Sequence, residues 1–317
     1  MEDKIFRSSA HPTMGIVLLG GLKDNVSRHP YHDSAGIAYS LVDKDSVAKT
    51  ELIISRDHRD SFINNEKVDI NGSRSPLRVI ERYRKQISEK YGMDNISVNS
   101  WNENIISGSS DAGAAALQRC INDALPEISS DQMEIEMRKV SESVGRSFYG
   151  GLTVTENHER PITTRILEHE SFSGFTIISA VFPHTRKPSD DIHFNQPKSP
   201  AYPERISKAN SRIMELRSLA EEKNIEGIFE LAMKDTDDYH ALNERVGVEI
   251  ITDEMRVLLR SIGKWREEIW MTYIVTGGNS VFIPCHREDS EEIRNLVSNH
   301  TAKMYELKVA GPATSGF

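Results

Sequence analysis

The sequence predicts an α+β fold with two lobes that divide near residue 173. Apolar, strand-like runs gather in the early and late parts of the chain, and helical patterns are mixed between them. The chain has 317 residues, which exceeds the usual range for a single hydrophobic core. We therefore expect residues 1–173 to form one lobe and residues 174–317 to form the other.

The first lobe is predicted to combine short strands with three helices. Apolar runs bounded by glycine or polar residues predict strands over residues 16–19, 35–41, 48–55, 96–99, 151–155 and 163–167. Composition and periodicity predict helices over residues 76–91, 112–125 and 130–147. Ser129 or Ser130 is expected to cap the third helix, because acidic residues follow in its first turn.

The second lobe is predicted to begin with a buried strand over residues 175–182, which Pro183 ends. The polar, proline-containing segment 184–203 is expected to be a substrate-covering loop or a linker. Further patterns predict helices over residues 203–223, 225–236, 252–270 and 290–300, and strands over residues 271–275, 281–284 and 304–309.

Charge and composition exclude several classes of protein. The formal net charge is −9 and the pI is about 5.7, which disfavours non-specific nucleic-acid binding but leaves room for a locally basic pocket. The sequence has no apolar run long enough to predict a membrane span, and no signal peptide is expected at its start. Cys120 and Cys285 are far apart, so neither a disulfide framework nor a structural zinc site is expected, and the reduced cytoplasm is the default location.

Residues 105–116, IISGSSDAGAAA, are the first candidate for chemistry. Glycine and serine just before a helix leave backbone N–H groups free, and the helix N-terminus favours an anion. The Ser109 and Ser110 hydroxyls could reach phosphate oxygens or a magnesium ion. The stretch lacks the lysine of a P-loop. From local chemistry alone it is either a phosphate-binding loop or a small-residue turn before a tightly packed helix.

Glu142 and Arg146 form a second candidate, because they lie four residues apart on the predicted helix 130–147 and so share a face. The alternative is a surface ion pair worth about 0.3–0.5 kcal/mol. Small neighbours such as Ser141 favour a wall close to a ligand. Two further features are ambiguous alone: Arg186 follows a strand in HTRKPSD, and Thr276 precedes a glycine pair that could be a plain hairpin turn.

In order along the chain, four stretches resemble the galactokinase, homoserine kinase, mevalonate kinase and phosphomevalonate kinase (GHMP) superfamily. They are AHPTMGIVLLGG from Ala10, residues 106–115, residues 141–151 ending in RSFYGG, and residues 276–281. The resemblance is greatest to the mevalonate diphosphate decarboxylase branch and covers nearly the whole chain. It implies a ribosomal-protein-like N-terminal lobe that binds ATP and a ferredoxin-like C-terminal lobe that completes the substrate cleft. It also implies Mg²⁺, phosphorylation of a tertiary 3-hydroxyl, and a homodimer.

Three departures from that branch separate this chain from its decarboxylases. Leu18 stands where those enzymes keep an active-site lysine, and Thr276 stands where they keep an aspartate. Glu142 replaces a small residue; it would repel a diphosphate, whereas it could accept a hydrogen bond from a free 5-hydroxyl. These departures match the archaeal mevalonate 3-kinases, which the sequence resembles more closely still. The resemblance then implies conversion of mevalonate and ATP to mevalonate 3-phosphate and ADP without decarboxylation, in an archaeal-type mevalonate pathway of isoprenoid biosynthesis. The alternative is an ATP-dependent decarboxylase of mevalonate 5-diphosphate or 3,5-bisphosphate.

The resemblance also suggests residue roles. The ATP phosphates are assigned to Ser107, Gly108, Ser109 and Ser110, the nucleotide pocket to Trp101 and Asn102, and Mg²⁺ to Ser110. The substrate is assigned to Leu18, Leu19, Ser141, Glu142, Arg146, Arg186 and Thr276, with Arg146 at its carboxylate and Glu142 at its 5-hydroxyl. Arg186 is expected to pair with Glu142 or the transferring phosphate. Arg146 and Ser109 are the predicted catalytic residues.

Overall fold

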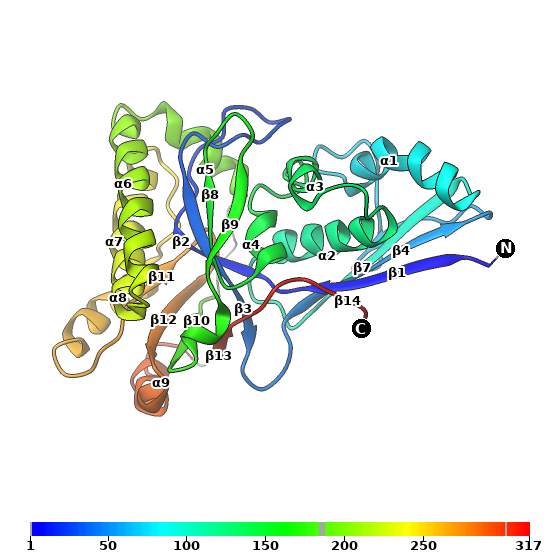
Figure 1. Ribbon diagram of the computed structural model, residues 1–317. Coiled ribbons are helices and arrows are strands. Elements are labelled where there is room, and N and C mark those ends of the chain that lie inside the picture. The colour runs from blue at the N-terminus through cyan, green and yellow to red at the C-terminus, as the bar shows by residue number, and fades with distance from the viewer. Residues whose placement is uncertain (1, 184–187, 302) are drawn as a thin grey trace.

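The computed structural model describes residues 2–183, 188–301 and 303–317, and it is built on two β-sheets. One sheet has the strand order β14-β1-β4-β7-β5-β6, and the other has the order β11-β12-β10-β13-β3-β8-β9 with β2 paired to β3. Helices cover both sheets, and the mixed architecture confirms the predicted α+β class (Figure 1).

The strands are β1 (Lys4–Ala10), β2 (Thr13–Val17), β3 (Ser34–Leu41), β4 (Val47–Ser55), β5 (Phe62–Ile63), β6 (Glu66–Lys67), β7 (Asn95–Glu103), β8 (Leu152–Glu156), β9 (Ile162–Leu167), β10 (Phe175–Val181), β11 (Ile274–Val275), β12 (Ser280–His286), β13 (Met304–Val309) and β14 (Thr314–Ser315). The α-helices are α1 (Pro76–Tyr91), α2 (Ser109–Ala124), α3 (Ser130–Met137), α4 (Val144–Tyr149), α5 (Ser189–Asn195), α6 (Tyr202–Glu221), α7 (Ile225–Arg245), α8 (Asp253–Trp265) and α9 (Ser290–Ser298). Short 3₁₀ segments are η1 (His169–Phe172), η2 (Gln196–Lys198) and η3 (Arg287–Asp289).

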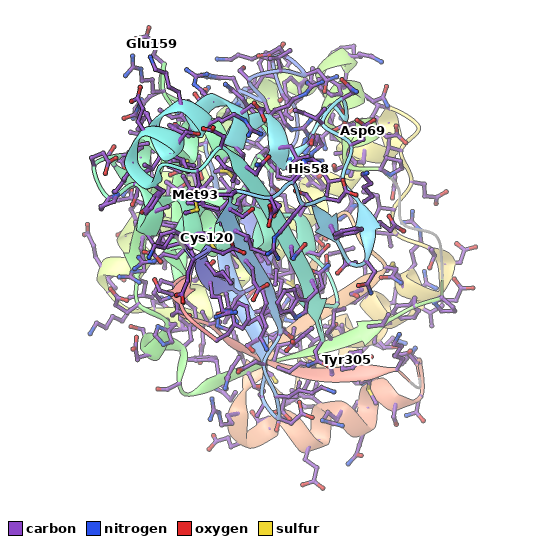
Figure 2. The ribbon with its side chains drawn as sticks, turned by 90° about the vertical axis from the view of Figure 1, so that its right-hand side faces the viewer. His58, Asp69, Met93, Cys120, Glu159 and Tyr305 are labelled. Atoms are coloured by element: carbon purple, nitrogen blue, oxygen red, sulfur yellow. The ribbon has the colours of Figure 1, made fainter. Side chains whose placement is uncertain are left out.

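The first sheet packs against α1, α2 and α3 (Figure 1). The alanine-rich face of α2 permits close approach, and its Ala114–Ala116 run is buried in this core. Met93 and Cys120 lie in the same core (Figure 2). Cys120 and Cys285 are both buried and free.

The second sheet joins strands from both halves of the chain. Leu307 in β13 pairs with Leu41 in β3, and β10 pairs with both β12 and β13. Helices α6 and α7 pack on this sheet through a shared apolar core. Near the C-terminus, β14 returns to pair with β1 in the first sheet. The division at residue 173 therefore stays a prediction, since strand pairing crosses it.

One predicted helix is wrong. Residues 130–147 form two helices, α3 and α4, and the chain turns between them. Ser129 does cap α3, because its side chain accepts a hydrogen bond from the Gln132 N–H. After Met137 the backbone hydrogen bonds are those of turns rather than of a continuous helix. The Ser141 hydroxyl donates to Asp111 on another helix. This tertiary bond competes with helix continuation at a residue of modest helix propensity. Glu142 and Arg146 are therefore not neighbours on one helical face.

Several other boundaries differ from the prediction, among them the end of α7, which lies at Arg245 rather than at residue 236. Segment 184–203 is not simply a loop, because its described part contains α5, η2 and the start of α6. Helix α2 begins at Ser109, so two of the serines expected in a loop lie in its first turn. Strand β2 ends at Val17, which leaves Leu18 and Leu19 in an irregular segment beyond it.

Candidate active site

Most of the predicted site residues line one cleft. From the sequence-based assignment, the cleft contains Leu18, Leu19, Ser107, Gly108, Ser110, Glu142, Arg146 and Thr276. It also contains residues that the sequence did not single out, among them Thr13, Gly15, Asp111, His193 and Tyr239. The walls come from β2, α2, α4, α5 and α7 and from the turn after β11, so the chain brings distant segments together here.

The N-terminus of α2 forms one end of the cleft. Gly108 is the N-cap residue with φ 78°, and a Cβ at this position would lie 2.6 Å from the Thr13 carbonyl oxygen. Only glycine combines that φ with such a close approach. The Ser107 N–H donates to the Tyr39 hydroxyl at 2.9 Å, and this hydroxyl donates back to the Ser107 carbonyl at 2.7 Å. A fixed turn and free N–H groups of a 16-residue helix suit an anion such as phosphate.

Asp111 lies in the first turn of α2 and was not assigned from the sequence, although it stands inside the SGSSDAG stretch. Its Oδ2 accepts from the Thr13 hydroxyl at 2.5 Å, and its Oδ1 accepts from the Ser141 hydroxyl. Both donors are neutral hydroxyls, and the carboxylate oxygens have further lone pairs for a ligand in the cleft that Asp111 lines. Ser141 is almost fully buried behind Asp111 and positions it rather than lining the cleft.

A second pocket adjoins the first across the start of α2. Ser110 lines both pockets, and Ser109 and Asn102 line only the second. Its other walls are largely apolar side chains: Ile63, Pro76, Val98, Ala114, Leu117 and Val140. Such a slot suits a flat aromatic ring. Trp101 does not line it, because successive strand residues face opposite sides; its ring packs edge-on against Phe317 instead, with centroids 5.3 Å apart.

Arg146 is a buried cation at the other side of the cleft. The residue is 5% exposed, and its Nε and Nη2 have no hydrogen-bond partner within the described part of the chain. Gly15 and Gly36 are register partners in β2 and β3, and a Cβ at Gly36 would lie 2.6 Å from Arg146 Cδ. The absence of a side chain at Gly36 thus makes room for Arg146. Burial lowers the pKa of Arg146, and Asp111 opposes that shift. An unpaired, desolvated guanidinium fork matches a carboxylate ligand.

Glu142 is held by donors from three different segments. Its Oε2 accepts from Arg28 Nε at 3.0 Å and from Arg74 Nη2 at 2.9 Å, and its Oε1 accepts from His193 Nε2 at 3.0 Å. Burial would raise the pKa of this carboxyl, but His193, Arg74 and Arg28 together hold it well below the ordinary value. Glu142 is therefore an ionised acceptor whose orientation is fixed.

The partners of Glu142 were not predicted. Sequence reasoning expected Arg186 to pair with Glu142 or with the transferring phosphate, and that residue lies outside the described residues. Arg28, Arg74 and His193 carry no local motif, and Arg28 is wholly buried with φ 52°. Their positions are set by long-range packing, so the sequence held no usable signal for them.

The turn after β11 closes the phosphate end of the cleft. Thr276 and Gly277 line the cleft, and a Cβ at Gly278 would lie 3.5 Å from Ser107 Oγ. The late glycine pair therefore faces the early glycine-serine stretch, as expected if both surround one ligand.

Candidate metal ligands are sparse in this region. Within the described ranges, the one group of three or more ionisable ligands close enough to hold an ion is Glu168, His169 and Glu170, none of which lines the cleft. Helices long and apolar enough to cross a membrane are absent from the described residues.

The fold and the cleft together define a class, namely the two-lobed GHMP-type kinases and their decarboxylase relatives. Residues 10–166 match the family model for the diphosphomevalonate decarboxylase-like N-terminal domain, and residues 187–291 match that for the mevalonate-3-kinase C-terminal domain.

Comparison with individual proteins shows which family within this class the chain resembles. The chain is 41% identical to the mevalonate-3-kinase of Picrophilus torridus over 316 residues, covering 98% of this chain and 97% of that protein. It resembles the crystal structure of mevalonate-3-kinase from Thermoplasma acidophilum with mevalonate 3-phosphate and ADP bound, at TM-score 0.94 and 35% identity, covering 100% of this chain and 99% of that one. Mevalonate diphosphate decarboxylase from Staphylococcus aureus shares the fold at TM-score 0.85 with 18% identity, covering 100% and 99% of the two chains. The chain belongs to the mevalonate-3-kinase family.

Proposed function

We propose that this enzyme transfers the γ-phosphoryl group of ATP to the 3-hydroxyl of mevalonate and releases mevalonate 3-phosphate and ADP without decarboxylation. The observation that carries the proposal is the Arg146 guanidinium, whose Nε and Nη2 have no partner among the described residues, in the same cleft as the N-terminus of α2. One end of the cleft suits a carboxylate and the other suits phosphates, so a small hydroxy acid between them would present its hydroxyl to ATP.

Phosphoryl transfer through a loose transition state depends on positioning and charge stabilisation more than on a strong base. Arg146 would fix the substrate carboxylate, and the α2 N-terminus with Gly108, Ser109 and Ser110 would hold the phosphates. Hydrogen bonds to the Tyr39 hydroxyl fix the Ser107 backbone, and Ser107 would lie beside the same phosphates. Asn102 and the apolar slot beside it would take the adenine. The packing of Trp101 against Phe317 gives it no direct part in this arrangement.

Mg²⁺ fits the residues at the start of α2. The Ser110 hydroxyl lines the cleft, and the Asp111 carboxylate has only neutral hydroxyl donors on its two oxygens, a hard oxygen set of the kind that Mg²⁺ prefers. When bound, the ion would neutralise charge on the transferring phosphate. Without it, Asp111 would repel phosphates at the helix terminus, so this carboxylate favours a bridging cation.

Glu142 would accept a hydrogen bond from the 5-hydroxyl. Its three donors hold it ionised and immobile, and a negative charge there opposes a 5-phosphate or 5-diphosphate. Leu18, Leu19 and Thr276 would line the cleft around the carbon skeleton.

The alternative, an ATP-dependent decarboxylase of a 5-phosphorylated mevalonate, is disfavoured by the same positions. Elimination of phosphate with loss of CO₂ needs organised charge around the reacting carbon. Leu18 and Thr276 are uncharged where the related decarboxylases keep a lysine and an aspartate. The resemblance further suggests a cytoplasmic homodimer, which size-exclusion chromatography with light scattering would test.

An ADP-release assay over a substrate panel tests the proposal. Mevalonate should be turned over, and mevalonate 5-phosphate and 5-diphosphate should be turned over much less. 3-Hydroxyisovalerate, which lacks the 5-hydroxyl, should react with a raised KM. Preference for either 5-phosphorylated substrate over mevalonate would overturn the proposal.

A further inference from the structure

The segment Leu18–Gly20 leaves β2 without strand pairing, and side chains of α6 and α7 hold its backbone instead. The Leu18 N–H donates to Asp235 Oδ2 at 2.7 Å, and the Leu18 carbonyl accepts from Arg205 Nη2 at 2.6 Å. Farther along, the Tyr202 hydroxyl donates to the Gly20 carbonyl at 2.5 Å. The backbone N–H and the backbone carbonyl of Leu18 thus both bond to one ion pair, that of Asp235 and Arg205.

That ion pair is a buried fork. Arg205 Nη1 donates to Asp235 Oδ1 at 2.5 Å, and Arg205 Nη2 donates to Asp235 Oδ2 at 3.0 Å. The two side chains are 2% and 0% exposed, and Arg212 adds a third bond to Asp235 at 2.8 Å. Desolvating two charges costs about as much as their attraction returns, so such a pair is weak evidence for a purely stabilising role. Its bonds to Leu18 give it another role.

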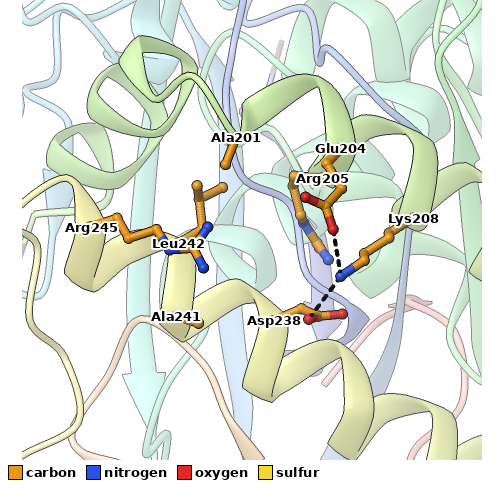
Figure 3. Close-up of a pocket in the computed structure, with 8 residues that line it drawn as sticks. All are labelled: Ala201, Glu204, Arg205, Lys208, Asp238, Ala241, Leu242 and Arg245. Atoms are coloured by element: carbon orange, nitrogen blue, oxygen red, sulfur yellow. Dashed lines mark hydrogen bonds and ion pairs between the residues drawn. The ribbon is translucent and has the colours of Figure 1, made fainter.

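A surface layer of charges lies beside the fork but does not touch Leu18. Arg205 forms part of the wall of a depression between α6 and α7 (Figure 3). In this layer Lys208 pairs with Glu204 at 3.0 Å and with Asp238 at 3.2 Å (Figure 3). Asp238 lies three residues after Asp235 on α7 and also pairs with Arg212. It shares the helix and a partner with Asp235, which makes it a matched control.

The residue whose backbone the fork holds belongs to a wall of the active-site cleft. Leu18 is 5% exposed and lines the cleft. A Cβ at Gly15 would lie 2.6 Å from Leu18 Cδ2 and 3.6 Å from Arg146 Nη1, so the leucine side chain and the guanidinium converge on the same glycine. A shift of the Leu18 backbone would therefore move the apolar wall beside Arg146 and admit water to it.

We infer that Asp235, through its fork with Arg205, is a positioning residue that sets Leu18 against the carboxylate end of the cleft. The inference rests on the proposed function for its substrate. Leu18 would contact ground state and transition state alike, so misplacing it should weaken binding more than it slows chemistry. Two helices from the second half of the chain would then shape a pocket wall that belongs to the first.

The test compares Asp235→Asn with Asp238→Asn by two readouts. The first is hydrogen exchange at the Leu18 amide, which needs no knowledge of the substrate. Exchange should accelerate about tenfold or more in Asp235→Asn and stay near wild type in Asp238→Asn. The second is steady-state kinetics with mevalonate, where Asp235→Asn should raise KM about tenfold and change kcat less than about threefold.

A double variant separates positioning from general damage. In a Leu18→Ala background the additional KM effect of Asp235→Asn should shrink, because the wall it positions is gone, while losses in Tm should still add. Asp235→Glu keeps the charge but displaces it, so it should raise KM even if Asp235→Asn fails to fold. Unchanged Leu18 exchange, or equal KM values for the Asp235→Asn and Asp238→Asn variants, would overturn the inference. Wild-type protein that ignores mevalonate would contradict the proposed function, and the exchange comparison would still decide the role of Asp235.

Discussion

Arg146 shows how a residue without a side chain, Gly36, makes room for a buried cation. Gly15 and Gly36 face each other in β2 and β3, and the Arg146 stem occupies the space that a Cβ at Gly36 would fill, while Leu18 occupies the space that a Cβ at Gly15 would fill. The spacing of four residues suggested that Arg146 and Glu142 share a helical face, which is wrong because the helix is broken, whereas the role of Arg146 at the substrate carboxylate came from the family resemblance. The expected substrate role remains a prediction, now supported by burial without a partner in the described residues.

Replacing Arg146 should separate activity from stability. Arg146→Met should lower kcat/KM for mevalonate by about a hundredfold or more, because a charge-assisted carboxylate contact is lost. Burial lowers the pKa of Arg146, so the unliganded protein holds this charge at a cost. The variant should therefore melt at a temperature equal to or higher than wild type in differential scanning calorimetry. A lower Tm with activity retained would show that Arg146 is structural.

Glu142 offers a second test at the residue scale. Glu142→Gly would leave Arg28, Arg74 and His193 without the carboxylate that they share. We expect kcat/KM for mevalonate to fall about tenfold or more, and the ratio for mevalonate 5-phosphate over mevalonate to rise, because an anion can replace the lost charge. Glu142→Gln, which keeps one acceptor oxygen, should show a smaller change. An unaltered ratio in Glu142→Gly would contradict the assigned 5-hydroxyl contact.

At the scale of elements, the sequence predicted most of helix α2. Composition indicated the helix, although its start moved from residue 112 to Ser109, and phosphate binding at that end remains a prediction. Helix α1 and strand β13 begin and end as predicted, since strong periodic patterns and a flanking proline or glycine define them. Segment 130–147 failed because a tertiary bond from Ser141 to Asp111 overrides local propensity.

Gly108 tests the α2 terminus. Gly108→Ala must adopt φ 78° and approach the Thr13 backbone, which cannot yield as a flexible side chain would. We expect a loss of about 1–3 kcal/mol in unfolding free energy and a larger rise in KM for ATP than for mevalonate. The comparison is Gly263→Ala inside α8, where an added Cβ has no described neighbour within 4 Å. That change should stabilise by up to about 1 kcal/mol, through helix propensity. Equal KM values for ATP in the two variants would exclude a role for the α2 turn.

At the scale of the whole molecule, long-range packing supplies what the sequence concealed. The fold class and the family were both predictable, because motif order and hydrophobic patterns can be read directly from the sequence. The partners of Glu142, and the fork of Arg205 and Asp235 that holds Leu18, come from helices and loops far apart in the chain. No pattern of sequence spacing connects Leu18 with Asp235 or Glu142 with Arg28.

Two buried histidines predict how the whole fold responds to acid. Burial lowers the pKa of His32 to about 4 and that of His240 to about 4. The unfolded chain takes up protons at these side chains below about pH 6.5, whereas the folded chain resists until about pH 4, so stability falls as pH falls through that window.

Chemical denaturation between pH 4 and 7 measures this slope. His240→Gln should take up about one proton fewer on unfolding across the window, which flattens the dependence of unfolding free energy on pH. His58 is exposed, so His58→Gln serves as the control and should keep the wild-type slope. The same slope in both variants would mean that His240 does not stay neutral in the fold.

The central claim is that the reaction stops at a phosphorylated product, and product analysis tests it most directly. Purified enzyme would be incubated with mevalonate, ATP and Mg²⁺, followed by phosphorus NMR and measurement of CO₂ in the headspace. We predict one new phosphomonoester resonance in equal amount to ADP, without CO₂ and without inorganic phosphate above the background of ATP hydrolysis. Release of CO₂ with inorganic phosphate, or turnover only when the substrate carries a 5-phosphate, would contradict the account.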